Sequence, residues 1–380
     1  MGRTALRLRG MILGPQGFVD GELQADAAGR ISSIAGVPAS AAQARESLLP
    51  RILPGFIDLH VHGGGGRDIM EGGDAARRVA SLHAEHGTTA LLATTMTAPM
   101  GDLDKAFAGL AATLAAGHGG GARVLGVHLE GPYINGGKLG AQPNYARPVQ
   151  LEELARLQAK VPIRLITLAP EIPANMKMIA TLCAAGHVVQ IGHTLGSYED
   201  GVQALALGAR GFTHLFNAMS GLHHREPGMV GAALAHAEFS EIIPDLLHAH
   251  PGAIRVALRA IPQLFCVTDS TAASGMPDGE YRLGRHKVTK CLGGVRLPDG
   301  TLAGSALTMD QALRNLVEVL ELDLADAARR VSTHAADYLG LSERGRLAVG
   351  AWADLVLLDR DLRLLGVYLE GVPFEHPHAV

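Results

Sequence analysis

The sequence predicts an α/β protein in which a (β/α)8 TIM barrel carries a small β-sandwich domain built from both termini. From residue 50 onward, eight short apolar runs alternate with helix-like stretches, which is the pattern of parallel strands connected by helices. Before residue 50 and after residue 345, short strands alternate instead with turns rich in Gly and Asp. We therefore expect a β-sandwich domain at residues 1–50 plus 345–380 and a barrel at residues 51–344.

The individual elements follow from the same patterns in chain order. N-terminal strands are expected at residues 5–13, 17–23 and 30–34. Barrel strands are expected at residues 56–61, 89–95, 123–129, 163–168, 187–191, 211–216, 241–247 and 264–267. Helices are expected between them at residues 74–86, 102–116, 151–159, 175–185, 198–207 and 253–260. A doubly wound sheet is the alternative, but no G-x-G-x-x-G follows the first strand in a dinucleotide-binding context.

Composition excludes several classes of protein. The chain has 380 residues, 47% of them hydrophobic, which is enough for a large core. A formal net charge of −4 and the lack of a basic run argue against a nucleic-acid partner. The sequence has no uncharged apolar run long enough to predict a membrane span. Arg7 and Arg9 interrupt the apolar residues at the N-terminus, so we expect no secretory signal there. The cysteines, Cys183, Cys266 and Cys291, are odd in number and far apart, so we expect no disulfide framework and a cytoplasmic location.

The first barrel strand ends in the stretch PGFIDLHVHGGGG, residues 54–66. His60 and His62 are separated by one residue, so both side chains leave the same face of the strand, as does that of Asp58. The glycines that follow let the backbone pass close to whatever the histidines hold. Two neutral imidazoles suit a divalent metal, although a pair of hydrogen-bonded histidines at a strand edge would give the same pattern.

Polar side chains lie at or just beyond the ends of six of the eight predicted strands. They are His60, His62, His128, Glu130, His193, His214, Asn217, His248, His250 and Asp269. The C-terminal ends of barrel strands form one rim, where the active sites of such barrels lie. Glu130, His193 and His214 suffice to hold one divalent ion with an open position, and His60 and His62 can contribute to a second.

Asp269 is the expected proton acceptor of this rim. A metal lowers the pKa of water toward about 7, and a nearby carboxylate can then take its proton. The structural alternative for Asp269 is a helix N-cap before Ser and Thr. Histidine and carboxylate ligands without thiolate suit Zn, Fe(II), Mn or Co, and we expect one or two ions per chain, with zinc favoured.

Six segments together resemble the amidohydrolase superfamily and, within it, the N-acetylglucosamine-6-phosphate deacetylase family. The segments are PGFIDLHVHG, HLEGPY, IGHT, THLFNAMSGLHHREPGMVG, VTDSTAASGMPDG and LAGSALTMDQALRNLV. The H-x-H pair is common to many amidohydrolases, whereas HLEGP, HLFNAM with HHREPG, and GMPDG are far more specific to the deacetylases. The resemblance covers essentially the whole chain.

The resemblance implies metal-dependent hydrolysis of the N-acetyl group of N-acetyl-D-glucosamine 6-phosphate, giving glucosamine 6-phosphate and acetate in amino-sugar catabolism. It implies Glu130, His193 and His214 as ligands of the main metal, and Asp269 as a general base that later protonates the leaving amine. The implied substrate contacts are Gln142, Asn217, Ala218, Arg225, His248, Leu302, Ala303 and Gly304.

Each of these contacts has an expected partner on the substrate. Asn217 and Ala218 would bind the phosphate, and Arg225 would clamp it, in this family often across a homodimer interface. An arginine offers a planar fork suited to phosphate, although a loop arginine is commonly a solvated surface residue. His248 would touch sugar hydroxyls, and the segment from residue 302 to residue 304 would line the acetyl end.

This sequence departs from the family pattern in two segments. Gln142 stands where the family commonly has a histidine, and an amide can bind a sugar hydroxyl but carries no charge. Gluco and galacto substrates therefore both stay open. The segment PDLLH, which ends at His248, stands where many members have A-D-G-x-H.

Two alternative functions also stay open. One is another amidohydrolase reaction, such as deacetylation of N-acetylgalactosamine 6-phosphate or opening of a cyclic amide. Many cyclic amidases bridge two metals with a carbamylated lysine, and no lysine ends the third or fourth run here. The other is a non-catalytic metal-binding paralogue, which would need neither the full ligand set nor Asp269.

Overall fold

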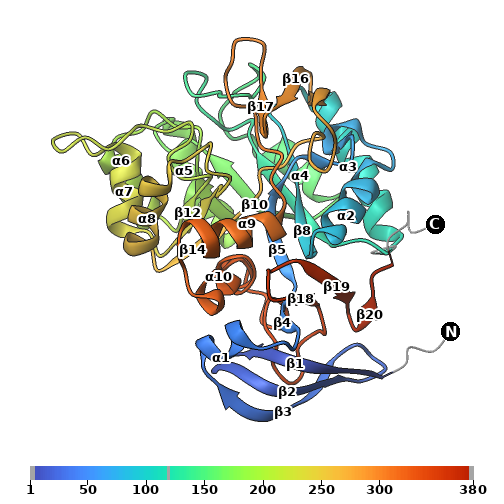
Figure 1. The fold of residues 1–380 in the computed structure, drawn as a ribbon. Coiled ribbons are helices and arrows are strands. Elements are labelled where there is room, and N and C mark those ends of the chain that lie inside the picture. Colours follow the sequence, from blue (N-terminus) through green and yellow to red (C-terminus); the bar gives the residue numbers. More distant parts are fainter. Residues whose placement is uncertain (1–4, 118–119, 376–380) are drawn as a thin grey trace.

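The computed structural model describes residues 5–117 and 120–375 and contains the predicted barrel (Figure 1). Its eight strands are β5 (Phe56–Val61), β8 (Thr88–Thr95), β9 (Arg123–Glu130), β10 (Ile163–Leu168), β11 (Val188–Ile191), β12 (Gly211–Phe212), β13 (Phe239–Ile242) and β14 (Gln263–Cys266). The first six form one curved parallel sheet, and β13 and β14 form a parallel pair. Backbone hydrogen bonds from Leu215 N to Glu241 O (3.0 Å) and from Asp269 N to His60 O (2.9 Å) join the two pieces. The predicted fold class is confirmed.

Helices flank the barrel strands (Figure 1). They are α2 (Ala75–Glu85), α3 (Met100–Ala115), α4 (Leu151–Gln158), α5 (Pro173–Ala184), α6 (Tyr198–Ala206), α7 (Gly228–His236), α8 (Pro251–Ala260), α9 (Met309–Arg314), α10 (Leu324–Arg330) and α11 (Thr333–Tyr338). The six helices predicted from the sequence are α2 to α6 and α8, and α6 begins with a capping box formed by Ser197 and Asp200. In the described part of the chain, none of the helices combines the length and apolar character needed to cross a bilayer.

Two predicted strands are shorter than expected or displaced. The seventh was expected at residues 241–247, but β13 ends at Ile242. Pro244 has no backbone N–H to donate to a neighbouring strand. Asp245 starts a turn, in which its side chain accepts hydrogen bonds from Leu247 N (2.9 Å) and His248 N (2.8 Å). The sixth was expected to reach residue 216, but β12 ends at Phe212. The backbone at residues 214 and 216 has positive φ angles of 29° and 80°, which lie outside the β region of residues with a Cβ.

Both ends of the chain meet in a second, mostly antiparallel sheet of seven strands. Its order is β20 (Val372–Pro373), β19 (Leu364–Leu369), β18 (Leu355–Leu358), β4 (Arg51–Pro54), β1 (Leu6–Gly14), β2 (Gly17–Ala25) and β3 (Ile31–Ala39). It has an apolar core of its own that includes Ile12, Leu23 and Ile52, and the short helix α1 (Ala41–Glu46) lies beside it in Figure 1. Strand β4 belongs to this sheet, so the sheet extends four residues past the predicted boundary at residue 50. The division into two domains remains a proposal.

A small antiparallel sheet that the sequence did not predict lies near the barrel's C-terminal rim (Figure 1). It consists of β15 (Gly279–Leu283), β16 (His286–Cys291) and β17 (Gly294–Arg296). The remaining short elements are β6 (Gly63–Gly64), β7 (Arg67–Asp68), η1 (Ile69–Glu71) and the π-helical turn η2 (Asn315–Val319). Leu283, the last residue of β15, reaches the cavity described below.

Candidate active site

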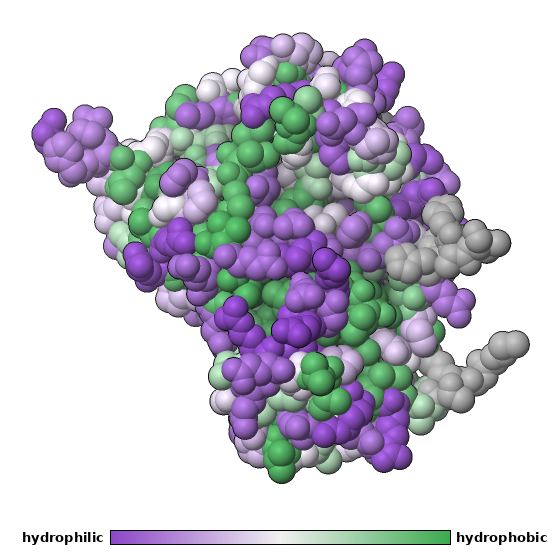
Figure 2. Space-filling view, viewed as in Figure 1, coloured by the Kyte–Doolittle hydropathy of each residue, from purple (hydrophilic) through white to green (hydrophobic). Residues whose placement is uncertain are grey.

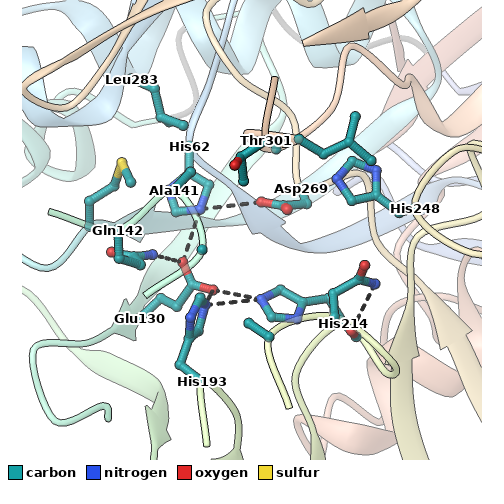
Figure 3. Close-up of a pocket in the computed structure, with 16 residues that line it drawn as sticks. His62, Glu130, Ala141, Gln142, His193, His214, His248, Asp269, Leu283 and Thr301 are labelled. Carbon is teal, nitrogen blue, oxygen red and sulfur yellow. Dashed lines mark hydrogen bonds and ion pairs between the residues drawn. The ribbon is translucent and has the colours of Figure 1, made fainter. Parts of the chain in front are cut away.

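Glu130, His193 and His214 come from three different strand ends and converge in space (Figure 3). The Oε1 atom of Glu130 lies 3.0 Å from Nε2 of His193 and 3.1 Å from Nε2 of His214. The two Nε2 atoms are 3.2 Å apart. All three side chains are buried. They form one candidate group of metal ligands.

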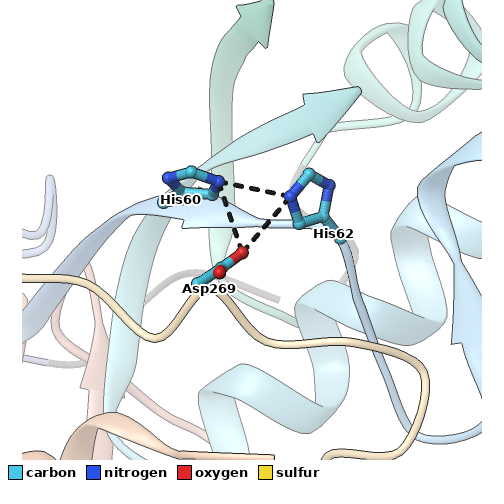
Figure 4. A group of neighbouring side chains, drawn as sticks. All are labelled: His60, His62 and Asp269. Carbon is cyan, nitrogen blue, oxygen red and sulfur yellow. Dashed lines mark hydrogen bonds and ion pairs between the residues drawn. The ribbon is translucent and has the colours of Figure 1, made fainter. Parts of the chain in front are cut away.

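His60, His62 and Asp269 form a second group beside the first (Figure 4). The Nε2 atoms of the two histidines are 3.2 Å apart, and Asp269 Oδ1 lies 3.4 Å from His60 Nε2 and 3.3 Å from His62 Nε2. Glu130 lies between the two groups, because its Oε2 is 3.1 Å from His62 Nε2 while its Oε1 faces the first group. One carboxylate could therefore serve two ions.

The protonation of two histidines shows that these groups fit a cation. His193 Nδ1 lies 2.8 Å from the carbonyl oxygen of Lys138, and His60 Nδ1 lies 3.0 Å from Glu241 Oε2. A carbonyl and a carboxylate only accept hydrogen bonds, so both Nδ1 atoms donate. Each ring therefore has only Nε2 left to bind an ion, and both Nε2 atoms face the other candidate ligand atoms. One ring nitrogen held by an acceptor and the other aimed at further ligands is the arrangement that a divalent metal requires.

Charge in the cavity leads to the same conclusion. Burial by itself lowers the pKa of His62, but hydrogen bonds with Asp269 and Glu130 outweigh it and raise that pKa to about 9. Burial likewise disfavours protonation of His60, yet Glu130, Asp269 and Glu241 hold its pKa well above the usual value. The buried carboxylates are thus stabilised by nearby positive charge, which protons or a metal can supply. Together with the ligand groups, this supports a divalent metal.

A third group, His60 with His128 and Glu241, is a hydrogen-bonded support. His128 Nδ1 donates to the carbonyl of Leu59 (3.0 Å), and its Nε2 accepts from the Thr167 hydroxyl (2.7 Å). Burial, followed by the nearby His60, lowers the pKa of His128 to about 3, so the ring is neutral. Both ring nitrogens of His128 are occupied, which leaves no lone pair for an ion.

One cavity of about 230 Å³ unites the predicted site residues. Those that line it are His62, Glu130, Gln142, His193, His214, Asn217, Ala218, His248, Asp269, Leu302 and Gly304. His60 lies below the lining and is fully buried, and Ala303 is also fully buried. The Gln142 amide points at Glu130, with Nε2 2.5 Å from Oε2 (Figure 3).

Arg225 lies away from this cavity. It belongs to the exposed segment 221–226 in the loop between β12 and α7, which projects from the body of the molecule (Figure 1). The projection is mainly hydrophilic in Figure 2. Arg225 Nη1 contacts Nε2 of the neighbouring His224 at 2.8 Å. His250, which followed the seventh predicted strand, caps α8 by accepting from Gly252 N.

Sequence reasoning missed several residues at the site. Met96, Leu283 and Thr301 also line the cavity, and Glu241 lies beneath it with no exposed surface. Leu283 could be predicted as a cavity residue only if the hairpin β15–β16, which places it there, had been predicted as well. Glu241 carried one signal, because a carboxylate inside an otherwise apolar run must have buried partners.

Asp58, which shares a strand face with His60, does not reach the cavity. Its Oδ2 accepts from the Thr268 hydroxyl (2.6 Å), and its Oδ1 accepts from the backbone nitrogens of Thr268 and His60, both at 3.2 Å. Burial raises its pKa to about 7. Asp58 therefore fastens β5 to the segment that follows β14 and so places His60 against Asp269.

The backbone at the site adopts left-handed conformations. His193, His214 and Asp269 have φ angles of 49°, 29° and 50°. Such angles are uncommon for residues with a Cβ and concentrate at functional sites. Gly304 approaches Asp269 so closely that a Cβ on it would lie 2.8 Å from the Asp269 carbonyl oxygen. Only glycine fits there without a shift.

The barrel and its rim of histidines and carboxylates are those of an amidohydrolase. Residues 51–373 match the amidohydrolase family, and the chain belongs to that family. Within it, the chain belongs among the N-acetylglucosamine-6-phosphate deacetylases. The enzyme of that name from Lysinibacillus sphaericus is 39% identical over 320 residues, which cover 82% of each chain.

Two further comparisons bear on the site. A solved structure of a mutant N-acetyl-D-glucosamine-6-phosphate deacetylase from Mycobacterium smegmatis, in complex with N-acetyl-D-glucosamine-6-phosphate, superposes with a TM-score of 0.89. It is 34% identical, and the match covers 98% of this chain and 99% of that one. An N-acetylgalactosamine-6-phosphate deacetylase from Escherichia coli is 36% identical over 367 residues, 95% of this chain and 96% of its own.

Proposed function

We propose that this chain hydrolyses the N-acetyl group of N-acetyl-D-glucosamine 6-phosphate, giving glucosamine 6-phosphate and acetate in amino-sugar catabolism. The observation that carries the proposal is the single cavity in which two candidate groups of metal ligands, one of them including Asp269, adjoin His248, Asn217 and Ala218. Family membership and the relatives' names agree with this reaction. A metal-binding paralogue without activity would hold metal but release no acetate.

We assign the main ion to Glu130, His193 and His214, and a second ion to His60, His62 and Asp269. When bound, a divalent cation supplies a Lewis acid that polarises the acetyl carbonyl and makes water more acidic. Ligands with nitrogen and oxygen but no sulfur suit zinc first, with Fe(II), Mn and Co as further candidates. Metal analysis of purified protein distinguishes one ion from two.

Asp269 is the proposed general base. Its Oδ1 faces the histidine ligands, and its pKa is lowered, because His60 and His62 outweigh the burial that favours the neutral form. An ionised carboxylate can take a proton from water as the water oxygen bonds to the acetyl carbon. Asp269 then transfers this proton to the nitrogen as the C–N bond breaks, so the products are the free amine and acetic acid, which loses the second water proton to solvent and becomes acetate.

His248 is the proposed donor to the substrate. Its Nδ1 lies 2.7 Å from Asp245 Oδ2, so its other nitrogen remains available to the cavity that it lines. Burial lowers the pKa of His248, but the hydrogen bond with Asp245 outweighs it and raises that pKa overall. A protonated His248 can donate to a sugar hydroxyl or to the oxygen that gains charge during attack.

The phosphate is assigned to Asn217, Ala218 and Arg225. The first two line the cavity, whereas Arg225 lies on the projecting loop. We propose that the chain forms a homodimer in which this loop reaches the partner's cavity. A guanidinium at the end of an exposed loop suits bidentate binding of a phosphate brought by another subunit.

The three cysteines are free, which fits the proposed cytoplasmic location.

Acetate release tests this function directly. Purified protein, with its metal content measured, is given N-acetylglucosamine 6-phosphate, its galacto epimer and unphosphorylated N-acetylglucosamine. We expect turnover of the gluco phosphate, and little of the sugar without phosphate. Preference for the galacto epimer would favour the second candidate, which the relative from Escherichia coli supports. No acetate from any of them, in protein that holds metal, would overturn the proposal.

A further inference from the structure

We propose that Glu241 and Gln142 are positioning residues, each of which orients a ligand of a different cation site. Glu241 would hold His60 for the site formed with His62 and Asp269. Gln142 would hold Glu130 for the site formed with His193 and His214. The inference rests on the metal dependence in the proposed function, and neither residue is assigned to the reacting atoms.

Glu241 is surrounded by hydrogen-bond donors. Its Oε2 accepts from His60 Nδ1 at 3.0 Å and from the backbone nitrogen of His214 at 3.1 Å. Its Oε1 accepts from Gln190 Nε2 at 2.9 Å, and Gln190 in turn accepts from the Tyr338 hydroxyl at 2.9 Å. Glu241 has no exposed surface. A buried carboxylate with three donors fixes both the rotation and the tautomer of the ring that it holds.

The hydrogen bond to Glu241 determines which ring nitrogen of His60 can bind an ion. With Nδ1 held by Glu241, His60 can bind a metal ion only through Nε2, which lies 3.2 Å from His62 Nε2 and 3.4 Å from Asp269 Oδ1. A neutral amide at position 241 would turn its NH2 group toward one of the three donors. Glu241→Gln therefore cannot reproduce the arrangement, although it preserves shape.

Both ends of the Gln142 side-chain amide are also hydrogen-bonded. Its Nε2 lies 2.5 Å from Glu130 Oε2, and its Oε1 accepts from the backbone nitrogen of Thr97 at 2.6 Å. The side chain is 6% exposed. By holding one carboxylate oxygen, it turns the other, Oε1, toward His193 and His214. Only one amide hydrogen remains for a sugar, so this residue acts mainly on the ligand.

Zinc affinity, measured one site at a time, tests both roles. A His62→Ala background leaves only the Glu130 site, and a His193→Ala background leaves only the His60 site. Gln142→Met, which preserves length but cannot hydrogen-bond as an amide does, is measured in the first background and Glu241→Gln in the second. Competition with a chromophoric chelator gives each zinc dissociation constant. We expect each to rise about 10- to 100-fold.

Exchanging the pairs supplies the control. Gln142→Met in the His193→Ala background and Glu241→Gln in the His62→Ala background should change zinc affinity less. Within the Glu130 site, Glu241 contacts only the backbone nitrogen of His214, and Gln142 is separated from His62 by Glu130. Equal losses at both sites, or none at the matched site, would overturn the proposal. A raised KM with unchanged zinc affinity in Gln142→Met would show that this residue only touches the sugar. If the unsubstituted protein bound no zinc, the proposed metal dependence would fail instead.

A measurement on the unsubstituted protein covers the case in which Glu241→Gln does not fold. Nitrogen NMR of the zinc-loaded enzyme reports the tautomer of each histidine ring. We expect the hydrogen of His60 on Nδ1. A hydrogen on Nε2 would contradict the role of Glu241.

Discussion

At the scale of single residues, the charge on Asp269 decides whether it can accept a proton. Its pKa is lowered because His60 and His62 outweigh burial, so it is ionised at neutral pH. Asp269→Asn has the same shape but no basic oxygen of comparable strength. We expect kcat to fall about 10²- to 10⁴-fold, while the ion held by Glu130, His193 and His214 remains. Steady-state kinetics and metal analysis of one preparation check this, and near-normal kcat would exclude the role.

His62 leads to a second prediction. Its pKa of about 9 in the metal-free protein means that it carries a proton at pH 7, and a cation at the His60 site must displace that proton. Zinc binding at this site should therefore release protons, and its affinity should increase as pH rises toward 9. Titration of metal-free protein in weak buffer with a pH indicator measures the release. Proton release that is unchanged in His62→Ala would contradict the prediction.

At the scale of elements, helix α2 holds the glycine turn after β5 through His83. His83 Nε2 lies 3.1 Å from the carbonyl oxygen of Gly63 and 3.0 Å from the Ser270 hydroxyl. Burial lowers its pKa to about 4. The folded-state pKa lies below the unfolded value of about 6.5, so the contribution of neutral His83 is fully present above pH 6.5 and is lost as pH falls toward 4.

Replacing His83 by a residue that does not titrate should remove this acid sensitivity. Between pH 6.5 and 5, the unfolding free energy of the unsubstituted protein should fall by about 1.5 kcal/mol more than that of His83→Gln. Urea unfolding of chelator-treated protein at both pH values measures the difference. Parallel losses in the two proteins would show that His83 does not titrate as described.

The loop between β12 and α7 is a second element with a measurable role. Arg225→Ala should raise KM for the phosphorylated sugar about 10- to 100-fold, because a charge-assisted hydrogen bond is worth about 1.5–3 kcal/mol, and should leave the unphosphorylated sugar unaffected. Glu226→Ala, in the same exposed segment, is the control. An unchanged preference for phosphate in Arg225→Ala would remove the assignment.

The elements also show what could be predicted from the sequence. The convergence of Glu130, His193, His214 and Asp269 was predictable, because each lies at or just beyond the end of an apolar run and strand ends share one rim. For Glu241 only the need for buried partners was predictable. The partners themselves come from β5, from β11 and from the segment after β12, which adjoin only in the closed barrel. The end of β13 had local signals, Pro244 and the turn at Asp245, which the apolar pattern concealed. The positive φ angles that end β12 had no such signal.

At the scale of the whole molecule, Arg344 joins strands of the terminal sheet. This buried guanidinium contacts Asp354 and, at 2.6 Å, Glu370 Oε1. Glu370 also pairs with Arg123 of the barrel strand β9. Arg344→Met leaves buried carboxylates without their shared cation, which should lower the unfolding free energy by about 3–5 kcal/mol and leave kcat unchanged.

Arg346→Met is the matched control for that prediction. Arg346 pairs with Asp337 in a more exposed position, where an ion pair contributes about 0–1 kcal/mol. Denaturant unfolding of the two variants compares the sites. Equal effects would mean that Arg344 adds no more than a surface pair does.

Strand β4 has a consequence for how the protein is made. It lies between β1, which precedes it closely, and β18, which is more than 290 residues further along the chain. During synthesis from the N-terminus, one edge of β4 stays open until the ribosome has released β18, and an open strand edge invites pairing with other chains. The terminal sheet therefore closes last. A nascent or truncated chain that lacks β18 would expose the unpaired edge of β4 next to a folded barrel, and this edge could pair with other chains and cause aggregation.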